Sequence, residues 1–79
     1  MNLKFFDLPE EKQQRIINSA LTVFSKYDYK KASTDEIVRL AGISKGLLFH
    51  YFSDKKTLYL FLLQYSSDFL IKEMSAFHD

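Results

Sequence analysis

Apolar residues recur at spacings of three and four along most of this chain, which is the pattern of helices that each bury one face. Between Pro9 and Tyr27 such a stripe consists of Ile16, Ile17, Ala20, Leu21, Phe24 and Tyr27. Pro9 is tolerated in a first helical turn, where its missing N–H has no partner, and Glu10 and Glu11 complement the positive end of the helix dipole. We therefore predict a first helix over this stretch and a connecting loop over residues 28–32.

Two short helices joined by a tight turn are predicted next. Ser33, with Glu36 three residues later, forms a capping box that starts the second helix. Gly42 supplies the left-handed residue that ends a helix at low cost, and Ser44 caps the third helix. The inward positions of the second helix are Ile37, Val38 and Ala41. Two helices joined by so short a turn cross at a steep angle, which is the helix-turn-helix arrangement. In this arrangement the later helix, here the third helix of the chain, lies in the DNA major groove.

The outward face of the third helix differs from a core face. A turn of roughly 100° per residue places Leu48 and Phe52 inward. The opposite side carries Lys45, Gly46, His50 and Tyr51, a set that suits contact with a phosphate backbone. Glycine within a helix costs about 1 kcal/mol relative to alanine. We therefore favour a functional reason for Gly46, namely that its missing side chain lets the backbone approach DNA closely.

A fourth helix begins after Ser53 or Asp54 and extends towards the end of the chain. Residues 58–63 are apolar all the way round, whereas a helix packed on one side by a small domain has polar residues on its other side. We therefore expect a partner chain or a further domain to cover the second face. Lys55 and Lys56 oppose the dipole in the first turn of this helix, a placement that a nearby phosphate would offset.

The composition favours an all-α fold and gives no sign of an enzyme. Only 2 Gly and 1 Pro are available for turns, while 8 Phe and 5 Tyr supply a core. The chain has no Cys, and its two histidines, His50 and His78, are too few and too far apart for a metal site, so we expect no metal and no cofactor. No nucleophile–base pair, paired carboxylates or glycine-rich phosphate loop is present, so we expect no catalytic activity.

Charge and hydropathy add less to the interpretation. The net charge is only +1, although the central part of the chain holds a modest excess of lysines that would suit phosphate contact. The longest apolar run, residues 58–63, is far shorter than the ~20 residues that a bilayer requires. We expect a cytoplasmic protein without a membrane partner.

The segments Ser33–Ile37, Ala41–Gly46 and Leu48–Lys55 together resemble the N-terminal DNA-binding domain of TetR-family transcriptional regulators, with similarity over roughly residues 9–65. The resemblance implies a three-helix head at residues 9–53, after an N-terminal arm at 1–8. It also implies that the fourth helix, at 54–79, leads to a C-terminal domain for ligand binding and dimerisation. The whole protein would be a homodimeric repressor of a palindromic operator in double-stranded DNA, released by a small molecule.

The resemblance also implies which positions meet DNA. These are Ser33, Ser44, Lys45, Gly46, Leu47, Phe49, His50, Tyr51 and Lys55. Two of them depart from the family pattern, because Leu47 stands where a hydroxyl residue is common and Phe49 where tyrosine is common. Each change removes a hydrogen-bonding group and favours apolar contact, for example with thymine methyl groups.

A helical protein-interaction module is the alternative. In that case the apolar fourth helix would be the binding surface and the short third helix would have a structural role only. Salt dependence of binding to duplex DNA separates the two hypotheses, because neutralising phosphates gives a steep dependence and an apolar groove does not.

Overall fold

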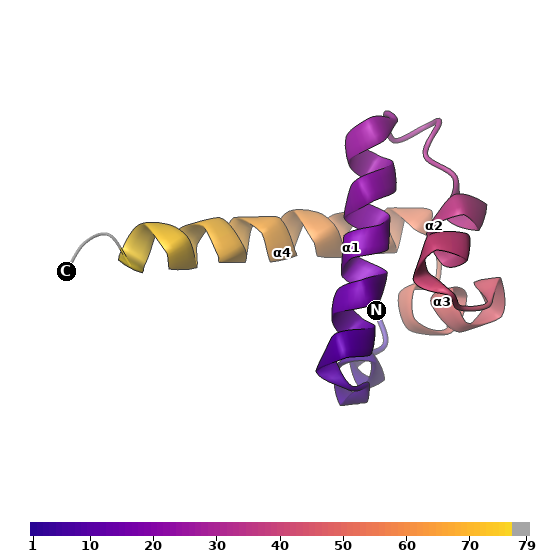
Figure 1. The fold of residues 1–79 in the computed structure, drawn as a ribbon, viewed down its shortest axis with the longest axis horizontal. Coiled ribbons are helices and arrows are strands. Elements are labelled where there is room, and N and C mark those ends of the chain that lie inside the picture. Colours follow the sequence, from indigo (N-terminus) through magenta and orange to yellow (C-terminus); the bar gives the residue numbers. More distant parts are fainter. Residues whose placement is uncertain (77–79) are drawn as a thin grey trace.

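The structure, a computed structural model, describes residues 1–76 as five helical segments without a strand among them (Figure 1). They are the 3₁₀ helix η1 (Leu3–Asp7) and the α-helices α1 (Glu10–Lys26), α2 (Thr34–Ala41), α3 (Lys45–Phe52) and α4 (Lys55–Ala76). The helices α1 to α3 form the head, and α4 crosses α1 and then projects away from it (Figure 1). The predicted all-α class and the helix-turn-helix are confirmed.

The boundaries of α2 and α3 follow from local capping. The hydroxyl of Ser33 accepts a bond from the Glu36 N–H at 3.4 Å, and that of Ser44 accepts one from the Leu47 N–H at 3.1 Å. Gly42 ends α2 at φ 69°, a left-handed conformation that glycine adopts without steric cost. These three residues therefore act as the sequence predicted.

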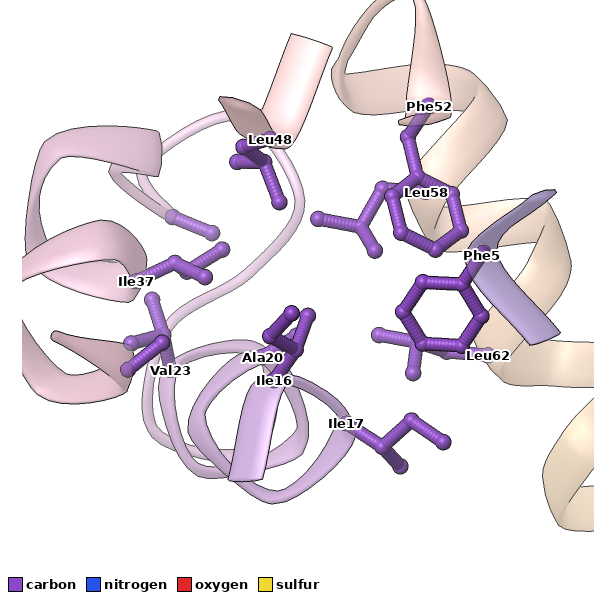
Figure 2. Packing of buried hydrophobic residues seen from close by; sticks show 12 residues of the cluster. Phe5, Ile16, Ile17, Ala20, Val23, Ile37, Leu48, Phe52, Leu58 and Leu62 are labelled. Carbon is purple, nitrogen blue, oxygen red and sulfur yellow. The ribbon is translucent and has the colours of Figure 1, made fainter. Parts of the chain in front are cut away.

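Side chains from all five segments meet in one core (Figure 2). Its buried apolar members are Phe5, Ile16, Ile17, Ala20, Val23, Ala32, Ile37, Ala41, Leu48, Phe52, Leu58 and Leu62. Two details of the predicted α1 stripe are wrong. Val23 is buried although the predicted stripe lacks it, and Tyr27, which the stripe contains, is 38% exposed. The reason for the second difference is that α1 ends at Lys26, so that Tyr27 has extended backbone angles and leaves the helical face.

The first eight residues, expected to form an arm, contribute η1 to the head. Phe5 is fully buried, and its ring centroid lies 5.0 Å from that of Phe52 and 5.6 Å from that of Phe61. The backbone N–H of Asn2 donates to the carbonyl of Tyr51 at 2.8 Å, in the last turn of α3. The chain's N-terminal segment thus holds the end of α3 in place.

The two faces of α4 have different environments. Leu58 and Leu62 are buried, whereas Leu60 and Leu63 on the other side are about half exposed, at 52% and 51%. Further along, Phe69, Leu70, Ile71 and Met74 are exposed as well. The apolar second face therefore lies open in the single chain, and its covering by a partner or a further domain stays a prediction.

None of the helices within residues 1–76 combines the length and apolar character needed to cross a bilayer.

The burial of Phe5 gives a direct stability test. Phe5→Ala should lower the free energy of unfolding by about 3–5 kcal/mol, because it removes a ring from the centre of the core. The control Phe6→Ala should cost only about 0.5–1.5 kcal/mol, since that ring is 51% exposed and contributes mainly aromatic contacts. Urea unfolding followed by circular dichroism measures both. Equal losses for the two variants would contradict the central position of Phe5.

Candidate nucleic-acid interface

The turn between α2 and α3 orients one face of α3 inward and leaves the other free. Leu48 and Phe52 are each only 1% exposed, as predicted for the inward face. The outward side holds the expected set, with Lys45, Gly46 and His50 exposed and Leu47, Phe49 and Tyr51 partly buried. α2 and α3 lie together at the end of the molecule opposite to the free end of α4 (Figure 1). The structure therefore groups most of the predicted contact residues on one surface.

The first turn of α3 combines backbone N–H groups with open space. The first N–H groups of a helix have no intrahelical acceptor, and Ser44 satisfies the one at Leu47. A Cβ added to Gly46 would meet no atom of residues 1–76 within 4 Å, and the backbone of Gly46 has no positive φ. Packing among residues 1–76 therefore does not require glycine at this position.

Lys45 belongs to an ion pair that the sequence did not predict. Its Nζ lies 2.9 Å from Oδ1 of Asp35 in the first turn of α2, with the side chains 52% and 75% exposed. Exposed pairs of this kind contribute only about 0–1 kcal/mol, so a phosphate could replace the carboxylate at little cost. Asp35 lies next to Lys45 because α2 and α3 cross at this point. Residue spacing along the chain does not predict such a contact between two helices.

The C-terminal part of the α3 surface is aromatic. The ring centroids of His50 and Tyr51 lie 5.0 Å apart with an edge-to-face angle of 67°, and the Tyr51 centroid lies 5.8 Å from that of Phe5. Tyr51 is thus anchored by its ring on the head, while His50 remains exposed.

Ser33 is exposed at the start of α2, where it caps the helix.

Lys55 makes contacts that differ from the expected phosphate contact. Its ammonium group donates to the backbone carbonyls of Tyr29 at 2.6 Å, Ala32 at 3.2 Å and Lys30 at 3.4 Å. It also lies 4.6 Å from the centre of the Tyr29 ring. The charge that opposes the α4 dipole is therefore offset by carbonyl oxygens of the chain itself.

The start of α4 is set by Asp54, one of the two capping residues considered from the sequence. Its carboxylate accepts a bond from the Thr57 N–H at 2.7 Å, and this hydrogen bonding holds the pKa of Asp54 below its ordinary value. Ser53 makes the sharp turn before it at φ 49°, with the Asp54 N–H donating to the carbonyl of Phe52.

Within residues 1–76, no three His, Asp or Glu side chains gather as metal ligands.

Comparison with known proteins places this geometry in a family. Residues 16–61 match the family model of bacterial regulatory proteins, tetR family. The HTH-type transcriptional regulator RutR of Escherichia coli K12 is 32% identical over 68 residues, covering 86% of this chain and 32% of RutR. The HTH-type transcriptional activator FasR of Mycolicibacterium smegmatis is 39% identical over 62 residues, covering 78% of the chain and 28% of FasR.

A solved structure shows the same arrangement. The crystal structure of a TetR family transcriptional regulator from Chloroflexus aurantiacus J-10-FL superposes with a TM-score of 0.76 at 45% identity, covering 82% of this chain and 30% of that one. The chain therefore spans about a third of the length of the proteins that it matches. Because the family model covers more than half of its residues, this chain belongs to the tetR family of bacterial regulatory proteins.

Proposed function

We propose that this chain is the DNA-binding head of a transcriptional regulator and that α3 enters the major groove. The observation that carries the proposal is the outward face of α3, where Gly46 opens the surface beside Lys45 while Leu48 and Phe52 are buried behind it. A helix held in this way from one side, after a tight turn, has the geometry of a recognition helix. The membership of the chain in a family of regulators supports the same function.

The surface suggests a division of roles among its residues. Lys45 and the N–H groups at the start of α3 suit phosphate oxygens, because the N-terminal end of a helix attracts anions. Ser33 and Ser44 lie at the starts of α2 and α3, where their hydroxyls cap the helices and would lie beside the phosphates. Leu47 and Phe49 offer apolar surface to thymine methyl groups, and His50 and Tyr51 offer polar groups to the DNA backbone.

The finer properties of the whole regulator are also proposals. We propose a homodimer that reads a palindromic operator with its two recognition helices about 34 Å apart, one turn of DNA. The exposed apolar face of α4 is the surface on which we expect a further domain or a second chain to pack. Such a domain would bind a small-molecule effector that releases the operator. The resemblance to TetR regulators favours repression, whereas the relative FasR is named an activator, and a reporter gene behind the operator distinguishes the two directions.

Salt dependence tests the DNA-binding function. Affinity for duplex DNA should fall as salt rises, with a log–log slope of about −0.9 for each phosphate neutralised. Four contacts per head give a slope of about −3.6 for one head and about −7 for a pair. Fluorescence anisotropy with a labelled mixed-sequence duplex measures it. A slope near zero would contradict DNA binding and favour the protein-interaction module, whose apolar surface on α4 would then be the functional one.

Gly46 tests the close approach of the backbone to DNA. Gly46→Ala should leave the thermal midpoint unchanged or raise the stability by up to about 1 kcal/mol, since the added methyl meets open space in a helical conformation. Affinity for a duplex selected from a random library should nevertheless fall about tenfold or more, because a clash at a packed contact costs about 1–3 kcal/mol.

The matched control for Gly46 is Ser67→Ala, an exposed position on the projecting part of α4. It should change neither affinity nor salt dependence. If Gly46→Ala bound the selected duplex as tightly as the unsubstituted chain, the close-approach explanation would be wrong, and glycine would simply be tolerated at this position.

A further inference from the structure

We infer that Lys55 is a positioning residue that fixes the loop before α2, residues 27–33, against the first turn of α4, instead of a residue that holds DNA phosphate. The inference deepens the proposed function and rests on it for its consequence in DNA binding. Its structural part, the attachment of the loop, stands on contacts within residues 1–76.

The ammonium group of Lys55 has its donors occupied by the chain. An ammonium carries three N–H donors, and three backbone carbonyls of the loop lie between 2.6 and 3.4 Å from Nζ. The Tyr29 ring, 4.6 Å away, adds a cation–π contact. A phosphate oxygen could bind this group only by displacing carbonyls that already accept charge-assisted hydrogen bonds.

The contacts of Lys55 hold the segment that leads into α2. Ala32, one of the three acceptor residues, is buried and directly precedes the cap residue Ser33. The other side of the loop is closed by Asp28, whose carbonyl accepts from the N–H groups of Lys31 at 3.1 Å and Ala32 at 2.9 Å. The loop is thus held by its own turn and, across the head, by Lys55.

An aromatic contact reinforces the same attachment. The ring of Tyr29 packs against Tyr59 of α4 at 5.0 Å, and Phe24 of α1 packs against Tyr59 at 5.1 Å. The loop therefore touches α4 at two positions one turn apart, Lys55 and Tyr59. Because α2 begins where the loop ends and α3 follows α2 after a tight turn, the position of the recognition helix depends on this attachment.

The test compares Lys55→Met, which keeps the apolar stem and removes the ammonium, with Lys56→Met at the exposed neighbouring position. Lys55→Met should lower the thermal midpoint by at least about 4 °C and shift the amide resonances of residues 28–34 in DNA-free protein. Its affinity for duplex DNA should fall about tenfold, measured well below the midpoint, while the log–log salt slope changes by less than about 0.3. Lys56→Met should leave the midpoint and the loop resonances unchanged.

Lys55→Arg adds a second distinction. Arginine restores the positive charge, but its planar fork does not fit three converging carbonyls as a compact ammonium does. A positioning role predicts that Lys55→Arg recovers little of the midpoint and of the loop resonances. A phosphate-binding role predicts that it recovers affinity and slope.

The inference would be overturned if the log–log salt slope of Lys55→Met became shallower by about 0.9 per head while the loop resonances stayed unchanged. That result would support a phosphate contact of Lys55. If the unsubstituted chain itself showed no salt-dependent binding to DNA, the proposed function would fail. The loop resonances would then still decide on the attachment, since that measurement contains no DNA.

Discussion

A helix of eight residues has too few internal hydrogen bonds to persist in water on its own, and this constraint shapes the whole head. α3 must be held from outside, and Leu48 and Phe52 supply the buried face that holds it. Ser44 satisfies one orphan N–H at its start, and the N–H of Asn2 reaches a carbonyl in its last turn. α3 packs against the remaining helices, and this packing fixes its position in the head.

Holding α3 from one side leaves its other side free for recognition. The free side carries Gly46 and Lys45, and the only partner described for Lys45 within residues 1–76 is the exposed carboxylate of Asp35. The net charge of the chain is only +1, because acidic residues such as Asp35 balance the lysines. Recognition in such a head depends on where charges and open backbone lie more than on how many charges there are.

Local chemistry allowed the sequence to predict the helices and the face of α3. The caps at Ser33 and Ser44, the left-handed Gly42 and the period of Leu48 and Phe52 each depend on residues within a few positions of one another. Contacts across the head had no such signal. Phe5 is buried because η1 folds back onto α3 and α4, Asp35 meets Lys45 because two helices cross, and Lys55 meets carbonyls more than twenty residues away. The family resemblance and the position of Lys55 in the first turn of α4 predicted a phosphate contact, whereas its surroundings in the fold show that it binds backbone carbonyls.

The central claim is that the outward face of α3 is the surface that meets DNA. Titration of the ¹⁵N-labelled chain with a duplex, followed by amide chemical shifts, tests it most directly. We predict that the perturbed amides cluster at residues 44–51, with a smaller group at the start of α2 around Ser33. Perturbations confined to residues 60–74 of α4, with α3 unchanged, would contradict the account and identify the apolar helix as the binding surface.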